Sequence, residues 1–239
     1  ERASSDVPPG HPWEYQERKQ KAAASLRSGI TQEQEDTTCF VVVDRWGNAV
    51  CQLQSLQSAW GSSLIAGDSG ILLNNRMTYW HMEEDHVDSL LPGKRVRHTM
   101  NPVMAFKGSS TSGNGTPRQL ALICGTPGAD TQVQTNLQVL SHVLDFGMTV
   151  AEAVEAPRWK NNQSPTESNL PHICNDELII EGRFPEDTVN GLRRRGHNLN
   201  ILEPWDGVTG REMMIQVDSD TGVLHGAADP RYDGYAVGC

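Results

Sequence analysis

Short runs of β-branched and alternating apolar residues predict several strands in the first half of the chain. Residues 37–44 (TTCFVVVD) and 48–56 (NAVCQLQSL) form two such runs, and the Gly47-Asn48 turn signal between them predicts a hairpin. Residues 70–75 (GILLNN) and 119–126 (QLALICGT) are two further predicted strands. This part of the chain therefore reads as β-structure joined by turns.

In the middle of the chain the apolar residues recur at helical spacing. Residues 131–147 are predicted to form a helix that stops at Gly147. Its apolar positions are Val133, Leu137, Leu140, Val143 and Leu144. A second helix is predicted to follow the candidate N-cap Thr149 and to end near Pro157. A third, residues 185–197 (PEDTVNGLRRRGH), opens with proline and acids, as helix starts do.

Strands and turns alternate again towards the end of the chain. Residues 177–180, 198–202, 212–218 and 222–230 are predicted strands, and an Asp-Ser-Asp-Thr-Gly turn precedes the last of them. There is no internal repeat of fixed period. Strands, two central helices and strands again predict a mixed α/β (α+β) fold in which helices cover layers of sheet.

Charge and composition narrow the classes of partner. The 239 residues include 30 acidic and 20 basic ones, with a formal charge of −10, so we expect no nucleic acid and no membrane surface as partner. No stretch approaches the roughly 20 apolar residues needed to cross a bilayer, and the first residues lack a signal-peptide pattern. The start, Glu1-Arg-Ala-Ser-Ser, reads as if cut from a longer chain.

The cysteines favour a reducing compartment. There are five, an odd number that cannot pair completely within one chain. Cys39, Cys51 and Cys124 each stand in an apolar or β-like run, where a buried free thiol is the common outcome. Their spacing matches no zinc pattern. We therefore expect reduced structural thiols, no metal site, and a cytoplasmic location.

Two adjacent threonines stand where a polar segment meets a buried strand. Residues 15–27 predict one helix, and the acidic tail 31–36 (TQEQED) predicts a solvated linker before Thr37. Threonine is a good β-former, so Thr37 and Thr38 are on one reading ordinary strand residues. On the other reading Thr37 is a nucleophile, because a threonine that starts its chain has its own α-amine as base. That chemistry requires cleavage between Asp36 and Thr37.

Five motifs in order carry a resemblance to a known family. They are TTCFVVVDRWGNAV, GDSGILLNNRM, PGKRVRHTMNP, CGTPGADT and GAADPRYDG. Together they resemble the small subunit of the γ-glutamyltransferase family of N-terminal nucleophile hydrolases. The likeness covers residues 37–239, and residues 1–36 resemble the C-terminal tail of the large subunit. The resemblance implies a four-layer α/β/β/α sandwich, autocatalytic cleavage at Asp36–Thr37, an acyl-enzyme on Thr37, and no cofactor. It also implies a heterodimer with a large subunit cut from the same precursor.

The same resemblance suggests roles for several residues. Thr37 matches the nucleophile, and Ser55 falls where the family has a second hydroxyl that supports it. Gln57 stands where the family often has an asparagine near the substrate. The backbone N–H groups of Gly128 and Ala129 match an oxyanion hole, whereas the simpler interpretation of this segment is a strand-to-helix turn.

The chain departs from the family where the substrate's α-amino acid group would bind. The family has an acid after its paired asparagines, but this chain continues with Arg76 and has no acid until Glu83. His98-Thr99 replaces the family's serine pair. An arginine repels an α-amine and favours a second carboxylate, although Arg76 can equally be a structural residue and His98 a loop histidine. The candidate substrate-binding residues are Gln57, Asn75, Arg76, Tyr79, His98 and Thr99.

These departures favour an amidohydrolase or acylase that cleaves the amide of a small carboxylate-bearing acyl group, such as an oxamate-like or glutaryl-like amide. A true γ-glutamyltransferase or glutathione hydrolase is the first alternative. The second alternative is an unprocessed, catalytically silent structural subunit. If the Asp36–Thr37 bond stays uncut, the α-amine of Thr37 remains part of a peptide bond and cannot act as a base. Near the C-terminus, Asp229 and Arg231 are candidates for an internal ion pair.

Overall fold

The computed structural model describes residues 35–108, 118–162 and 176–238. The predicted helix at residues 15–27 lies outside these ranges. The predicted hairpin is confirmed: β1 (Glu35–Val43) pairs antiparallel with β2 (Ala49–Ser58). Asp44 closes the turn, since its carboxylate accepts from the backbone N–H groups of Trp46 at 2.9 Å and Asn48 at 2.8 Å.

A four-stranded antiparallel sheet forms the centre of the protein. Its order is β3 (Val103–Lys107), β4 (Gln119–Gly125), β8 (Met213–Val217) and β9 (Leu224–Ala228). The last three strands were predicted from the sequence, whereas β3 was not. The β3–β4 and β8–β9 pairs join consecutive strands, so the β4–β8 pairing is the one that connects distant parts of the chain.

The predicted strand at residues 70–75 is wrong. Residues 64–73 fold back on themselves with only an isolated bridge between Ile65 and Leu72. The backbone bonds are local, as in Leu73 N–H to Leu64 O at 2.9 Å, and Ile71 remains 63% exposed. The apolar run is therefore a surface loop, because no neighbouring strand of the described chain pairs with it.

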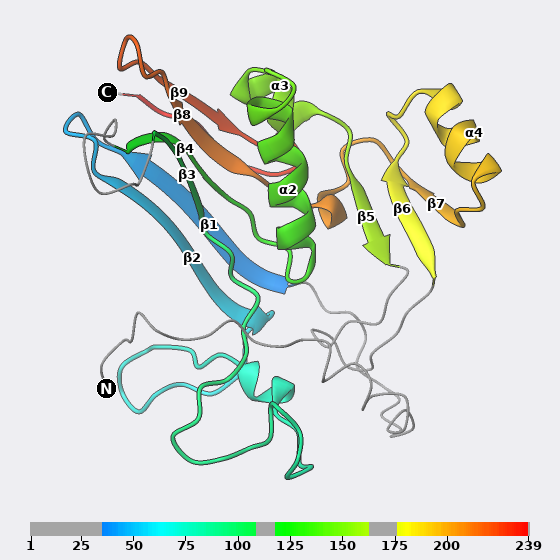
Figure 1. The fold of residues 1–239 in the computed structure, drawn as a ribbon. Helices are drawn as coiled ribbons and strands as arrows, with labels where there is room; N and C mark the ends of the chain where they lie inside the picture. The colour runs from blue at the N-terminus through cyan, green and yellow to red at the C-terminus, as the bar shows by residue number, and fades with distance from the viewer. Residues whose placement is uncertain (1–34, 109–117, 163–175, 239) are drawn as a thin grey trace.

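A smaller three-stranded sheet lies to one side, as Figure 1 shows. Its order is β5 (Trp159–Asn162), β6 (Glu177–Glu181) and β7 (Leu199–Leu202). The strands β6 and β7 are parallel, and α4 (Glu186–Arg194) makes the crossover between them. This helix confirms the prediction from the proline and acids at its start.

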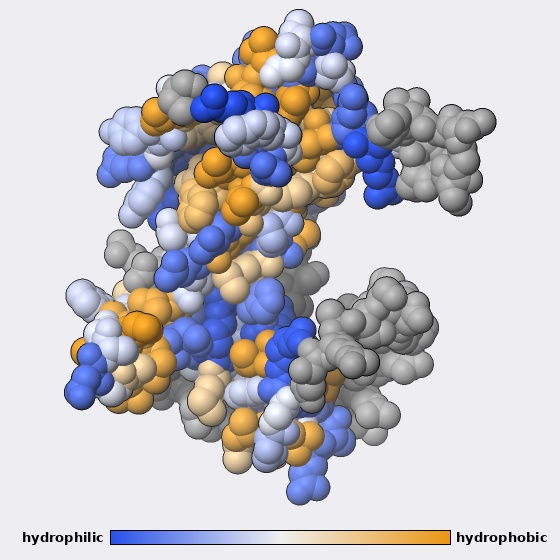
Figure 2. All heavy atoms as spheres, turned by 90° about the vertical axis from the view of Figure 1, so that its left-hand side faces the viewer, coloured by the Kyte–Doolittle hydropathy of each residue, from blue (hydrophilic) through white to orange (hydrophobic). Residues whose placement is uncertain are grey.

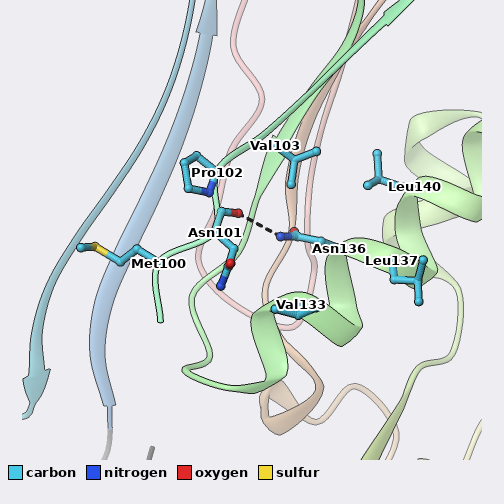
Figure 3. A pocket seen from close by; sticks show the side chains of 8 residues that line it. All are labelled: Met100, Asn101, Pro102, Val103, Val133, Asn136, Leu137 and Leu140. Atoms are coloured by element: carbon cyan, nitrogen blue, oxygen red, sulfur yellow. Dashed lines mark hydrogen bonds between the residues drawn. The ribbon is translucent and has the colours of Figure 1, made fainter. Parts of the chain in front are cut away.

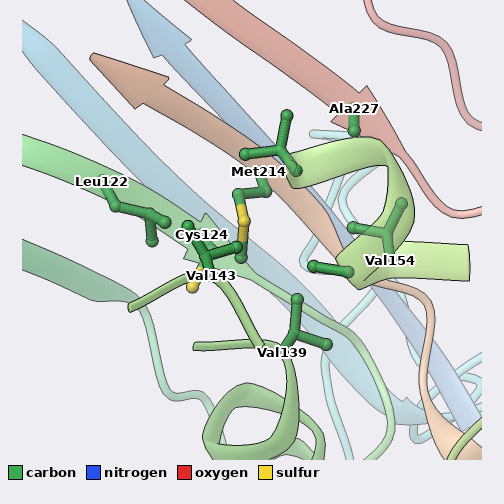
Figure 4. Close-up of a cluster of buried hydrophobic side chains, with 9 residues drawn as sticks. Leu122, Cys124, Val139, Val143, Val154, Met214 and Ala227 are labelled. Carbon is green, nitrogen blue, oxygen red and sulfur yellow. The ribbon is translucent and has the colours of Figure 1, made fainter. Parts of the chain in front are cut away.

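Helices α2 (Thr131–Leu144) and α3 (Val150–Glu155) cover one face of the central sheet. Thr149 caps α3 as predicted, with Glu152 completing a capping box. The core between helices and sheet is apolar (Figure 4) and includes Leu122, Cys124, Val139, Val143, Val154, Met214 and Ala227. The β1–β2 hairpin packs on the opposite face, where Cys39 and Cys51 lie against Gly125. The described residues thus form a mixed α/β structure of helices, a central sheet and a second small sheet.

The buried face of α2 is more polar than its sequence pattern indicates. Val133 and Leu137 are exposed, although their spacing helped to predict the helix. The buried positions include Gln132 and Asn136, which hydrogen-bond the backbone of Asn101, and Thr135, which donates to the Thr209 carbonyl at 2.7 Å. These side chains are buried because they satisfy backbone groups of neighbouring segments.

A buried cluster of charges joins the small sheet to the central one. Arg231 binds Glu181 through two hydrogen bonds and pairs with Asp229 at 3.0 Å, which confirms the predicted ion pair. Arg158, fully buried, pairs with the other oxygen of Asp229. In the described residues no helix is long and apolar enough to cross a membrane.

Candidate active site

The hydroxyls of Thr37 and Ser55 meet across the β1–β2 ladder. The two residues are direct partners in the strand register, and their oxygens are hydrogen-bonded at 2.8 Å. The register shifts next to them, because Asp36 pairs with Gln57 and leaves Leu56 as an extra residue. Bulges of this kind re-aim side chains beside active sites. Gln57, at the bulge, has a left-handed backbone with a φ of 78°.

Arg76 turns its guanidinium towards this hydroxyl pair. It begins the 3₁₀ turn η1 (Arg76–Tyr79) and is only 6% exposed. One terminal nitrogen donates to Ser55 Oγ at 2.7 Å. The other donates to the hydroxyls of Tyr79 at 3.2 Å and Thr99 at 3.3 Å. Three predicted site residues far apart in sequence therefore share one buried cation.

Paired asparagines hold η1 against the end of β2. Asn74 accepts from the Arg76 backbone N–H at 3.0 Å. The Asn75 side chain makes two hydrogen bonds to Ser58, and its backbone N–H donates to Leu56 O at 3.1 Å. Asn75 was predicted to bind substrate, but its side-chain groups bond to β2 in this structure. Its contacts set where Arg76 enters the site.

Gln57 contacts both the hydroxyl pair and η1. Its backbone N–H donates to Ser55 Oγ at 3.0 Å, and its side-chain amide donates to Thr78 Oγ1 at 2.9 Å. His98 lies apart from this group: it is exposed, and its Nδ1 accepts from the Met100 N–H at 3.3 Å. Of His98 and Thr99, the pair that replaces the family's serines, only Thr99 contacts the site, through its hydrogen bond with Arg76.

The Gly128-Ala129 segment forms the turn that leads from β4 into α2. Gly128 has a φ of 132° and Ala129 a φ of 45°, so both are in a region that disfavours side chains. Within the described chain, neither of their N–H groups donates a hydrogen bond, whereas their carbonyls accept from Thr131 and Gln132 at the start of α2. Two adjacent free N–H groups at a helix start suit a developing negative charge.

This segment and Thr37 lie at the same end of the structure. Thr37 and Cys39 share one face of β1, and Cys39 lies against Gly125, just before the segment. Figure 1 shows the start of β1 and the start of α2 at this end. Thr126 holds the loop, since its hydroxyl accepts from the Arg211 N–H at 2.7 Å and donates to Pro127 O at 2.7 Å.

The thiols beneath the site are structural. Cys39, Cys51 and Cys124 are free, as predicted. Burial raises the pKa of the Cys124 thiol far above its ordinary value, so it stays protonated.

Glu212 lies beside Cys124 and was not predicted from the sequence. The only sequence feature that could have indicated a buried carboxyl is the apolar run that follows Glu212. Burial raises the pKa of its carboxyl to about 8.

The described residues contain no group of three or more His, Cys, Asp or Glu side chains placed to hold a metal ion. A hollow of about 390 Å³ lies between α2 and the segment before β3 (Figure 3). It is lined by Met100, Asn101, Pro102, Val103, Val133, Asn136, Leu137 and Leu140. None of these is a predicted site residue, so the hollow is separate from the hydroxyl pair.

The chain is similar to known proteins of one family. The model of the gamma-glutamyltranspeptidase family matches residues 3–239. A glutathione hydrolase-like YwrD proenzyme of Bacillus subtilis is 38% identical over 203 residues, which are 85% of this chain and 36% of that protein. An oxamate amidohydrolase proenzyme of Klebsiella pneumoniae is 31% identical over 203 residues, 85% of this chain and 35% of that protein.

A solved structure is similar as well. The cephalosporin acylase of Bacillus halodurans superposes with a TM-score of 0.65 at 29% identity, covering 82% of this chain and 33% of that one. The chain thus spans about a third of the length of the curated relatives named above.

Proposed function

This chain belongs to the gamma-glutamyltranspeptidase family, and from that premise we propose that it is the catalytic portion of an autoprocessed amidohydrolase. The nucleophile of the proposed enzyme is Thr37. One observation carries the proposal: the Thr37 hydroxyl is hydrogen-bonded at 2.8 Å to Ser55, which a buried arginine contacts in turn. An ordinary strand threonine has no need of such an arrangement.

The reaction starts with cleavage of the chain itself. Thr37 Oγ attacks the Asp36 carbonyl carbon, the Asp36–Thr37 C–N bond breaks, and water hydrolyses the resulting ester. Thr37 is then left with a free α-amine, whose reference pKa of about 7.7–8.0 allows it to accept a proton near neutral pH. In turnover this amine takes the hydroxyl proton while Oγ attacks the substrate amide.

The amine then passes the proton to the leaving nitrogen, the amide C–N bond breaks, and an acyl-enzyme ester on Thr37 remains for water to hydrolyse. The N–H groups of Gly128 and Ala129 stabilise the oxyanion in both steps. Removal of one such donor costs about 10²–10³ in rate in other enzymes.

The substrate that fits best is an amide whose acyl group carries a carboxylate but no α-amine. Arg76 lies over the Tyr79 ring, at 5.6 Å from its centre, and has no carboxylate partner in the described residues, whereas the nearby Arg97 pairs with Asp130 at 3.4 Å. Arg76 therefore gives the site a positive field. A positive field attracts a second carboxylate and repels an α-ammonium group. The oxamate amidohydrolase and the cephalosporin acylase among the relatives are consistent with such acyl groups.

Hydrolysis or transfer of γ-glutamyl groups is the second candidate. The glutathione hydrolase-like relative from Bacillus subtilis favours it. The two candidates differ in one chemical feature, because a γ-glutamyl group is a glutaryl group with an added α-amine.

We also infer how the chain fits into its whole protein. Residues 1–36 are the tail of a large subunit, and residues 37–239 are the small subunit cut from the same precursor. The large subunit completes a four-layer α/β/β/α sandwich by covering the outer face of the hairpin. Phe40 and Val42 on that face are 45% and 50% exposed. On the side of the molecule that Figure 2 turns to the viewer, hydrophobic side chains lie exposed among hydrophilic ones. The cytoplasmic location stays a prediction.

Two measurements test the proposal. Intact mass is followed during incubation of the full-length protein, with Thr37→Ala as the control. Cleavage before Thr37 in the wild type alone supports the nucleophile, whereas an uncut wild type supports the silent subunit. Matched glutaryl and γ-glutamyl anilides then separate the substrate classes. A higher kcat/KM for the glutaryl compound is expected, and the reverse order would make the γ-glutamyl reaction the function.

A further inference from the structure

Three hydrogen-bonding groups surround Ser55 Oγ, but a hydroxyl oxygen can accept only two hydrogen bonds. Ser55 must therefore donate its own proton to one of the three. Its neighbours are the Gln57 backbone N–H at 3.0 Å, the Arg76 guanidinium at 2.7 Å and the Thr37 hydroxyl at 2.8 Å. The first two groups can only donate. A serine oxygen has two lone pairs, and these two donors fill them. The Ser55 proton therefore points at Thr37.

We propose that Arg76 is a positioning residue which, together with the Gln57 N–H, holds the Ser55 hydroxyl as a hydrogen-bond donor to Thr37 Oγ1. This assignment of the proton follows from the contacts alone. Its catalytic consequence rests on the proposed function, in which Thr37 is the nucleophile. It gives Arg76 a task other than direct binding of the substrate's carboxylate.

The fixed proton direction prepares Thr37 for attack. With Ser55 donating to it, the Thr37 oxygen has its own proton free to point at a base. Negative charge that develops on this oxygen is stabilised by the Ser55 O–H and, one bond further, by the guanidinium. Such preorganised donors act without reorientation during the reaction, which is why they are effective in a site shielded from water.

The surroundings of Arg76 suit this task. Its remaining contacts are the neutral hydroxyls of Tyr79 and Thr99 and the Tyr79 ring, and no carboxylate of residues 35–108, 118–162 or 176–238 forms an ion pair with it. A buried cation without a counter-ion is costly, so structural stability alone would not favour it. The planar guanidinium joins Ser55 on one nitrogen to Thr99 on the other, which fixes its orientation.

A double-mutant cycle tests whether Arg76 acts through Ser55. Arg76→Met, Ser55→Ala and the double variant are made in the full-length protein, and single-turnover acylation is measured with a glutaryl anilide and a neutral butyryl anilide. Each single variant is expected to lose rate on the order of 10²-fold with both substrates. The double variant is expected to be no slower than Ser55→Ala. Independent, multiplying losses would overturn the proposal.

The two substrates separate positioning from substrate binding. If Arg76 instead held the substrate's carboxylate, Arg76→Met would raise KM for the glutaryl compound and leave the butyryl compound unchanged. Arg76→Lys, which keeps the positive charge and a single donor nitrogen, should recover part of kcat relative to Arg76→Met. Arg193→Met, an exposed arginine of α4, controls for loss of charge, and thermal unfolding of every variant controls for folding.

Neutron diffraction from deuterated crystals decides the proton direction whether or not the protein is active. A deuteron on Ser55 directed at Thr37 Oγ1 supports the proposal. A deuteron on Thr37 directed at Ser55 overturns it. An uncut, inactive wild type would contradict the proposed function, while the neutron map would still decide the hydrogen-bond direction.

Discussion

Cys39 Sγ and Gly125 meet where the β1–β2 hairpin packs on the central sheet: a Cβ added to Gly125 would lie 2.9 Å from that sulfur and 2.9 Å from Cys51 Sγ. The hairpin that carries Thr37 and Ser55 therefore approaches the sheet as closely as a glycine allows. This contact sets the distance between the hydroxyl pair and the loop that follows β4.

Gly125→Ala is expected to destabilise the protein by about 1–3 kcal/mol, because overpacking forces the hairpin or the sheet to shift. Urea unfolding measures this loss. Cys51→Ala in the same chain removes one of the two opposing sulfurs and should restore part of the stability. A Gly125→Ala variant as stable as the wild type would show that the hairpin is free to move away.

Gly128→Ala should destabilise the protein more than Ala129→Gly does. Gly128 has a φ of 132°, which is open only to glycine, so alanine there should cost more than about 1 kcal/mol and slow acylation. Ala129 has a φ of 45°, where the left-handed conformation costs an alanine about 1–2 kcal/mol. Glycine there relieves this strain but gains freedom in the unfolded chain, so a change within about 1 kcal/mol is expected.

Unfolding free energies and single-turnover rates check both variants. Equal losses at the two positions would contradict the backbone conformation described for the loop.

Glu212 should make stability fall as the pH rises. Burial raises the pKa of this carboxyl from 4.5 to about 8, so the folded protein holds a proton that the unfolded chain releases. The stabilisation is fully present below pH 4.5 and is lost as the pH passes through about 8. Urea unfolding at pH 5.5 and pH 9 is compared between the wild type and Glu212→Gln, which does not titrate.

The wild type should lose a few kcal/mol more than Glu212→Gln over this range, at about 1.4 kcal/mol for each pKa unit. Parallel losses in the two proteins would show that Glu212 titrates normally in the folded state.

Asp229→Ala should cost about 3–5 kcal/mol, because it leaves Arg158 and part of Arg231 buried without a counter-ion. The exposed turn residue Asp220 supplies the matched control, and Asp220→Ala should change stability by less than about 0.5 kcal/mol. Thermal and urea unfolding measure both. Similar small effects would mean that the cluster tolerates the loss through bound water or ions.

Local signals predicted much of the fold correctly. The hairpin around Gly47, the helix starts at Thr149 and Pro185, and three strands of the central sheet follow from turn residues, caps and β-branched runs. The apolar run at residues 70–75 misled because a short apolar run between turn residues looks like a buried strand, whereas a strand exists only where a neighbour pairs with it. Helix α2 was found through its spacing, but the spacing did not reveal its polar buried face.

The sequence by itself determined the hairpin, the three helices, the free thiols, and the family to which Thr37 and its motif belong, because these depend on local chemistry and on ordered motifs. Only the tertiary structure decided what Arg76 does. Its guanidinium bonds to residues 21 and 23 positions away, and the direction of a long side chain is set by packing between segments. Contacts of this kind carry no periodicity along the chain, so no sequence pattern reports them.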